Sequence, residues 1–205
     1  MYNLSKNNYH QKPKNSNIQT PPAVSQFIFE LLRDKIDKKG VILDPCSGQG
    51  SLLKPWEDNC HPFDYTIYGV DIDEETESDL IANFLTLTKK EFELNYFAEL
   101  EVKKPALVLC NPPFNGYKGK LGSELWLDKI IELFGKEVPI VLFAPIGFRL
   151  HHKGREYFQQ KYPPISSIIS LPKNIFEGVL FHCEILIFNI EGLKGHYFYS
   201  KNQEE

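Results

Sequence analysis

A glycine-containing loop follows directly on an apolar run in the first quarter of the sequence. Val41-Ile42-Leu43 is typical of a buried strand, and it leads into the loop Asp44 to Gly50, after which a helical pattern begins. Gly48 and Gly50 would let a ligand approach the backbone closely, and a helix start presents free N–H groups. The loop is therefore a candidate ligand-binding segment.

An acidic residue ends the next apolar run, about 20 residues beyond Gly50, which is the spacing at which an acid reaches the ribose hydroxyls of a nucleoside. This residue is Asp71. The loop lacks both the three-glycine dinucleotide pattern and the Lys-Ser/Thr pair of a P-loop, so phosphate is not its obvious ligand. Asp44 would instead favour a cationic amino acid end, such as that of S-adenosylmethionine. The alternative is that Asp44 and Asp71 only terminate strands and cap helices.

The segment Asn111-Pro112-Pro113-Phe114 follows a later apolar run, 106–110, at the edge where open α/β sheets bind ligands. The Asn111 side-chain oxygen and the next backbone carbonyl can each accept one hydrogen from a planar amino group. The prolines make the turn rigid and add no competing donors. Phe114 offers an apolar face for a nucleobase. This arrangement suits methylation of an NH2 group without a strong base, although a strand terminator with a core Phe is the alternative.

Alternating helices and strands are expected to position these residues. Thr20 is a plausible N-cap and Pro21 the first residue of a helix over 21–37. Further helices are expected at 51–56, 74–81 and 123–134, between apolar runs at 41–43, 65–70, 106–110, 140–143, 165–171 and 185–188. This alternation predicts an α/β fold, with a mostly parallel sheet, helices on both faces and an antiparallel end.

The composition is that of a single globular domain of 205 residues. Residues 1–18 are expected to be a flexible arm, and 19–205 one catalytic domain. No apolar run is long enough to span a membrane and no secretion signal is evident, so the cytoplasm is the expected location. The four cysteines are far apart, which argues against a metal site. The net charge is -4, so nucleic acid would have to meet a local basic face.

The order of these segments, from about Gln19 to Phe188, resembles the gamma class of amino-methyltransferases, the N6-adenine DNA methylases of restriction-modification systems. The resemblance implies a Rossmann-like S-adenosylmethionine-dependent methyltransferase with a seven-stranded sheet. It also assigns roles by position. The implied cofactor-binding residues are Thr20, Pro21, Asp44, Pro45, Cys46, Gly48, Gly50, Asp71, Ile72 and Asn83, and the implied catalytic residues are Asn111, Pro112, Pro113 and Phe114.

Two of the implied positions are specific to the resemblance. Asn83 stands before Phe84-Leu85 where the family often has Asp, and its amide oxygen would accept a bond from the cofactor's adenine. Phe176, in the segment 171–176, corresponds to an aromatic residue that stacks on the flipped target base, with an ordinary core Phe as the alternative. Phe114 and Phe176 would then hold the base.

The gamma class usually carries a separate target-recognition domain after the catalytic one, and we expect none here. A base must leave the duplex at a cost of a few kcal/mol, which extensive DNA contacts normally offset. We therefore expect either a partner specificity subunit or a structured or single-stranded substrate. His182 is expected to be packed rather than metal-bound. Candidates for phosphate contact, with plain solvation as the alternative, are Lys118, Lys120, Arg149, His151, His152, Lys153 and Arg155.

Methylation of adenine N6 in DNA is the leading hypothesis. RNA is a close variant, and methylation of a protein glutamine amide is a second enzymatic hypothesis, because such enzymes use a similar Asn-Pro-Pro turn. A third hypothesis is a methyltransferase-like subunit that binds nucleic acid or supports a catalytic partner without turnover.

Overall fold

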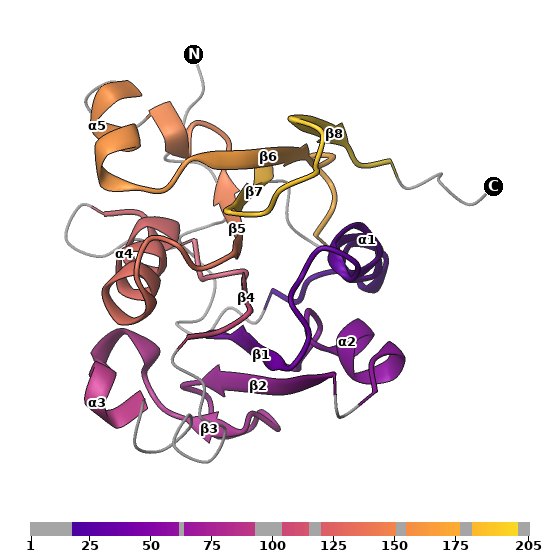
Figure 1. Ribbon diagram of the computed structural model, residues 1–205, viewed down its shortest axis with the longest axis vertical. Coiled ribbons are helices and arrows are strands. Elements are labelled where there is room, and N and C mark those ends of the chain that lie inside the picture. The colour runs from indigo at the N-terminus through magenta and orange to yellow at the C-terminus, as the bar shows by residue number, and fades with distance from the viewer. Residues whose placement is uncertain are drawn as a thin grey trace.

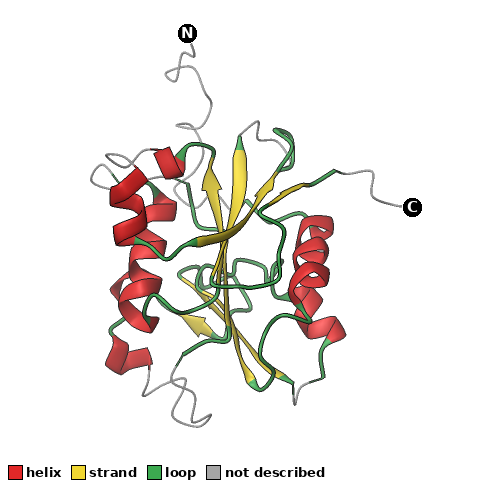
Figure 2. Cartoon of the chain, turned by 45° about the horizontal axis from the view of Figure 1, so that its top comes forward, coloured by secondary structure: helices red, strands yellow, loops and turns green. Residues whose placement is uncertain are grey.

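The computed structural model describes residues 18–61, 64–92, 104–114, 120–150, 155–176 and 182–200. A single sheet lies between two layers of helices (Figures 1 and 2). The strands are β1 (Gly40–Asp44), β2 (Tyr65–Asp71), β3 (Leu80–Ile81), β4 (Leu107–Cys110), β5 (Ile140–Pro145), β6 (Ile165–Ser170), β7 (Cys183–Phe188) and β8 (His196–Phe198). The α-helices are α1 (Pro22–Leu32), α2 (Lys54–Asn59), α3 (Lys89–Phe92), α4 (Gly122–Phe134) and α5 (Arg155–Lys161).

The sheet has the strand order β3-β2-β1-β4-β5-β7-β6-β8. All neighbours pair in parallel except β7, which is antiparallel to both β5 and β6. The predicted α/β class, with a mostly parallel sheet and antiparallel pairing toward one end, is confirmed. The described residues form eight strands, not the seven that the resemblance implies: the six predicted apolar runs each become a strand, and the short strands β3 and β8 add one at each edge.

The chain reverses its direction across the sheet between β1 and β4. From β1 it proceeds outward through β2 to β3, and it then returns to place β4 on the other side of β1. Such a switch point leaves a crevice outside the carboxyl ends of the two strands, where open α/β sheets bind ligands. The glycine loop follows β1 and the Asn111 segment follows β4, so both lie at this crevice.

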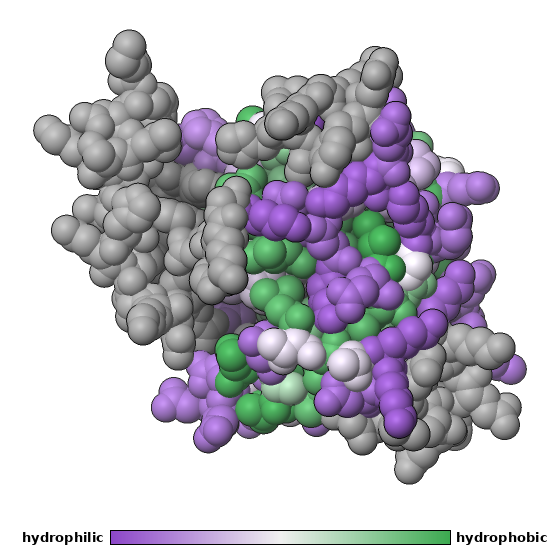
Figure 3. All heavy atoms as spheres, turned by 90° about the vertical axis from the view of Figure 1, so that its left-hand side faces the viewer, coloured by the Kyte–Doolittle hydropathy of each residue, from purple (hydrophilic) through white to green (hydrophobic). Residues whose placement is uncertain are grey.

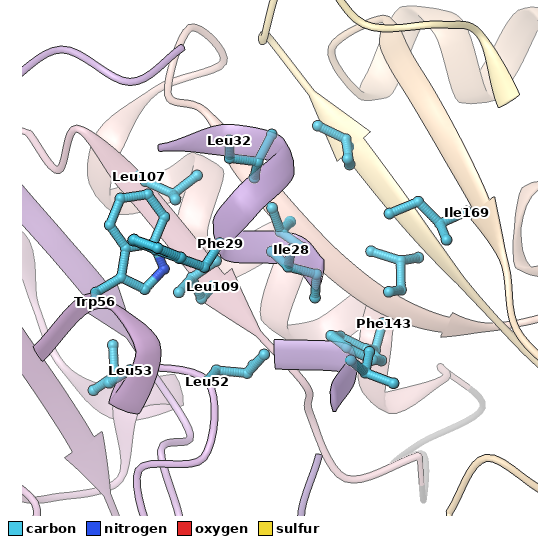
Figure 4. Close-up of a cluster of buried hydrophobic side chains, with 14 of the residues drawn as sticks. Ile28, Phe29, Leu32, Leu52, Leu53, Trp56, Leu107, Leu109, Phe143 and Ile169 are labelled. Atoms are coloured by element: carbon cyan, nitrogen blue, oxygen red, sulfur yellow. The ribbon is translucent and has the colours of Figure 1, made fainter. Parts of the chain in front are cut away.

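Alternating side chains divide the core into two clusters. Leu107 and Leu109 of β4 belong to the cluster under α1 and α2, whereas Val108 and Cys110 belong to the cluster under α4. Figure 4 shows the first cluster, in which the Phe29 ring meets the Trp56 ring edge-on at 5.1 Å. A buried side chain of this kind stabilises the fold by about 1.5–3 kcal/mol. Figure 3 shows the face of the molecule on the side of α4, where hydrophilic and apolar side chains lie together at the surface.

Three predicted helices differ from the structure. The helix expected over 51–56 begins at Lys54 and ends at Asn59, after a turn at 51–53. The helix expected over 21–37 ends at Leu32, after which the chain turns. The helix expected over 74–81 does not form. Short polar side chains there bond to nearby backbone and to each other: Asp73 Oδ1 accepts from the Glu75 N–H, and the Thr76 hydroxyl donates to the Asp73 carbonyl. Such local bonds compete with helix formation.

Within the described residues, no helix is both long enough and apolar enough to cross a membrane.

Candidate active site

A cavity opens at the switch point between β1 and β4. Its walls come from the segment before α1 and from the loops that follow β1, β2 and β4. The lining residues are Ile18, Gln19, Thr20, Asp44, Cys46, Ser47, Gly48, Ser51, Leu52, Asp71, Ile72, Asp73, Thr76, Asn111, Pro112, Pro113 and Phe114. The structure therefore brings together the glycine loop, the acid after β2 and the Asn-Pro-Pro-Phe segment.

The glycine loop is fastened to the end of β2 through Asp71. The Gly48 N–H donates to Asp71 Oδ2 at 2.7 Å, and the Asp73 N–H donates to Asp71 Oδ1 at 3.0 Å. Gly48 and Gly50 have φ values of 53° and 74°, which side chains rarely allow. A carboxylate offers about four acceptor positions, so Asp71 can still receive two ribose hydroxyls. Its placement fits the role expected from its spacing.

Asp44 is a buried carboxyl group at the floor of the loop, with 1% of its surface exposed. The Cys46 N–H donates to its Oδ1 at 3.0 Å. Burial raises the pKa of Asp44 from 3.8 to about 7, the bond from Cys46 opposes this rise, and the charge of Asp71 adds to it. A positively charged amine beside Asp44 would favour its ionised form. The site thus fits the cationic amino acid end of S-adenosylmethionine.

Asn111 presents the two ends of its amide to different surroundings. Its Nδ2 donates to the Thr20 hydroxyl at 3.0 Å. Its Oδ1 is buried and has no hydrogen-bond partner among the described residues. An unsatisfied buried acceptor costs about 1–3 kcal/mol. Because Asn111 lines the cavity, a ligand N–H group is the natural partner for this oxygen.

The two candidate base-holding rings differ in position. Phe114 lines the cavity and is 9% exposed. Phe176 does not line it, and its side chain is 2% exposed. Its ring packs edge-on against Phe114, with centroids 6.2 Å apart, and lies tilted against Phe143. In this conformation Phe176 supports Phe114 from the core, and its stacking on a base stays a prediction.

The remaining predicted cofactor residues fall into two groups. Ile72 lines the cavity with 66% of its surface exposed, so it offers an apolar face for an adenine ring. Pro21, Pro45, Gly50 and Asn83 do not line the cavity. The Asn83 Oδ1 accepts from the Leu85 N–H at the start of a short 3-10 helix.

The prediction that Thr20 caps the first helix is wrong. Pro21, not Thr20, occupies the N-cap position of α1, and no side chain caps that helix. The Thr20 hydroxyl instead meets Asn111, which lies far away in the sequence, so helix-start patterns could not reveal it. Sequence analysis also missed Gln19 and Ser51: the Ser51 hydroxyl donates to Gln19 Oε1 at 2.8 Å, joining the segment before α1 to the glycine loop.

Two of the seven predicted basic contacts, Arg149 and Lys120, pair with acidic side chains of the protein itself. Arg149 makes two bonds of 3.0 Å with the carboxylate of Glu184, and Lys120 pairs with Asp128 at 2.9 Å. Phosphate contact by Arg149 would therefore compete with an internal ion pair. Lys118, His151, His152 and Lys153 lie outside the described residues, as does the expected arm up to residue 17, and the side chain of Arg155 is likewise not described.

The fold is Rossmann-like, and its cavity lies at the switch point where open α/β sheets bind ligands. The chain's solved relatives share the fold at low sequence identity. A Vibrio vulnificus protein described as a modification subunit of a putative type I restriction enzyme has a TM-score of 0.63 and 16% identity, over 95% of this chain and 49% of its own. A Listeria monocytogenes protein described as a putative class I S-adenosylmethionine-dependent methyltransferase has a TM-score of 0.60 and 18% identity, over 92% and 68%.

A type I restriction-modification methyltransferase subunit from Streptococcus thermophilus has a TM-score of 0.56 and 18% identity, over 91% of this chain and 48% of its own. The chain thus spans about half the length of two of these three structures. No curated protein sequence is significantly similar to it. The chain belongs to the N-6 DNA Methylase family, whose model matches residues 1–132.

Proposed function

We propose that the protein transfers the methyl group of S-adenosylmethionine to N6 of adenine in DNA. The observation that carries the proposal is the buried Oδ1 of Asn111, a residue that lines the cavity: this oxygen has no hydrogen-bond partner among the described residues. An exocyclic NH2 group supplies the missing donor. Membership of the N-6 DNA Methylase family supports adenine as the base that carries it.

The cavity residues fit the cofactor in three places. Asp44 would face its cationic amino group, Asp71 its ribose hydroxyls and Ile72 its adenine ring. When bound, S-adenosylmethionine supplies an electrophilic methyl group on sulfur. The proposed cofactor-binding set also includes residues that line the cavity, namely Thr20, Cys46 and Gly48, and residues adjacent in the chain to cavity-lining ones, namely Pro21, Pro45 and Gly50. The contact of Asn83 with the cofactor's adenine stays a prediction from the resemblance.

The Asn-Pro-Pro-Phe segment would orient the target amine. Asn111 Oδ1 and the carbonyl of Pro112 each accept one amino hydrogen, so the nitrogen lone pair is freed from the ring and aimed at the methyl carbon. The bond from N6 to the methyl carbon would form as the bond from that carbon to sulfur breaks, with the neutral thioether of the cofactor as the leaving group. The two acceptors would stabilise the positive charge on N6 until one proton leaves to water. Pro113 keeps the turn rigid, and Phe114, with Phe176 behind it or beside it, holds the base.

Recognition of DNA is proposed to require a partner subunit. The chain has a net charge of -4, and two of its candidate phosphate contacts, Arg149 and Lys120, are already paired with acidic groups. Phosphate contacts supply most of the affinity of DNA-binding proteins. Additional basic surface from a second protein would provide it.

The test is a methyl-transfer assay with labelled cofactor and separate pools of duplex DNA, single-stranded DNA, RNA and protein. The wild type should place the label on N6 of adenine in DNA, and Asn111→Ala should abolish it. Asn59→Ala, at the exposed end of α2, is the matched control and should be active. Label in RNA or on protein glutamine would show that this polymer, and not DNA, is the substrate. Cofactor binding without any transfer would indicate a non-catalytic subunit.

A further inference from the structure

The contact between Thr20 and Asn111 joins the segment before α1 to the end of β4. The Asn111 Nδ2 group donates to the Thr20 hydroxyl oxygen at 3.0 Å, and the two residues are 91 positions apart. Both line the cavity. The bond occupies the donor end of the amide, while the acceptor end, Oδ1, is buried without a partner among the described residues.

The direction of this amide decides whether the site can receive an amine. With Oδ1 toward the cavity, Asn111 accepts a hydrogen from the target NH2 group. With the amide reversed, Nδ2 would face the NH2 group, and two donors would oppose each other. The productive direction therefore needs an acceptor for Nδ2 on the other side, and Thr20 Oγ1 is the acceptor placed there.

Thr20 itself is held firmly. Only 3% of its surface is exposed, and the following Pro21 has φ -59°, with its carbonyl accepting from the Val24 N–H at the first turn of α1. On its other side, Gln19 is tied to Ser51 of the glycine loop. A hydroxyl fixed in this way is preorganised, so it does not have to be ordered when substrate arrives.

We propose that Thr20 is a positioning residue for methyl transfer: by accepting from Nδ2, it keeps Asn111 Oδ1 directed at the amine. The proposal rests on the proposed function of the same cavity, and it assigns Thr20 a role beyond contact with the cofactor. Thr20 does not touch the reacting atoms and acts through Asn111.

Thr20→Val and Thr20→Ser form the matched pair of variants. Valine has nearly the shape of threonine but accepts no hydrogen bond, whereas serine retains the hydroxyl. At saturating cofactor and DNA, kcat of Thr20→Val should fall about ten- to a hundredfold. Thr20→Ser should stay within about threefold of wild type. A role only in cofactor binding would raise KM for S-adenosylmethionine and leave kcat unchanged, and this result would overturn the proposal.

The Asn111→Asp background separates positioning from general damage to the fold. A carboxylate presents an oxygen in either direction, so its orientation no longer matters. Adding Thr20→Val to Asn111→Asp should change the remaining kcat by less than about threefold, because the two effects are not additive. An equal loss in both backgrounds would show that the valine disturbs the site generally, and would contradict the positioning role.

Proton exchange of the Asn111 side-chain amide tests its hydrogen bond to Thr20, and this measurement does not require methyl transfer. In protein labelled with 15N at asparagine, the Asn111 side-chain amide is identified by its loss in Asn111→Ala. Its protons should exchange slowly with water in the wild type and in Thr20→Ser, and faster in Thr20→Val. If the wild type transfers no methyl group, the proposed function fails. If the Asn111 amide protons exchange equally slowly in Thr20→Val, the hydrogen bond to Thr20 is refuted, whatever the result of the methyl-transfer assay.

Discussion

Replacing Asp44 by asparagine should stabilise the protein more at high pH than at low pH. The free energy of unfolding of Asp44→Asn, measured relative to that of the wild type, should therefore rise with pH. Asp44 is 1% exposed, and burial raises its pKa from 3.8 to about 7. Between these two values the folded state binds a proton that the unfolded state has lost. The contribution of Asp44 to the free energy of unfolding therefore decreases as the pH rises through this window.

The size of the effect follows from the two pKa values. The rise from 3.8 to about 7 corresponds to roughly 4 kcal/mol, at about 1.4 kcal/mol per pKa unit. Part of this penalty is already present at about pH 5, so between about pH 5 and about pH 8 it should grow by roughly 2–3 kcal/mol. The asparagine of the Asp44→Asn variant does not titrate, but its side-chain oxygen can still accept the bond from the Cys46 N–H.

Urea unfolding of the wild type and Asp44→Asn over this pH range is the direct assay. The difference in unfolding free energy, variant minus wild type, should increase by roughly 2–3 kcal/mol toward the higher pH. Asp34→Asn is the matched control, because the Asp34 side chain is 87% exposed, and its difference should stay constant. A constant difference for Asp44→Asn as well would refute the argument from burial.

Two further predictions concern the ends of β2 and β7. Asp71→Ala should weaken S-adenosylmethionine binding about ten- to a hundredfold by calorimetry, because the ribose loses its acceptor and the Gly48 N–H loses the bond that shapes the loop; unchanged affinity would exclude Asp71 from the cofactor site. Arg149→Ala should lower the free energy of unfolding by about 1–3 kcal/mol, since it leaves the Glu184 carboxylate, 4% exposed, without its charged partner. Arg149→Met with Glu184→Leu should recover part of that loss in the same assay, and no recovery would count against the ion pair as the cause.

The parts of the fold that could be predicted are those encoded by short, continuous segments. The strands β1, β2 and β4 are apolar runs in the sequence, and the polar residues at their ends indicate the glycine loop, Asp71 and Asn111 without knowledge of any contact. Parallel strands bring their carboxyl ends to one edge, so these three segments had to meet once the sheet was parallel. The site was predictable because its chemistry lies at strand ends.

The parts that could not be predicted depend on partners distant in the sequence or on competing local bonds. The acidic stretch after Asp71 has a helix-like composition. In the structure the Ser78 hydroxyl bonds to those of Ser47 and Thr76, and Asp79 accepts from the Gly69 N–H, which fastens the stretch to β2 and the glycine loop. Helix-start patterns predict Thr20 to be a cap, whereas its partner, Asn111, is 91 positions away. Sequence periodicity carries no information about such pairs.

Two groups in the cavity are costly to the folded protein by itself. Asn111 Oδ1 is a buried acceptor without a partner among the described residues, and Asp44 is a buried carboxyl whose ionised form is disfavoured. The two costs are of different kinds, and they require different ligand groups: an N–H donor for the first and a positive charge for the second. A ligand that supplies either group removes that cost only in the folded state, so binding should also stabilise the fold. A target amine and a cationic cofactor meet these two requirements separately, which is the arrangement that a two-substrate methyl transfer needs.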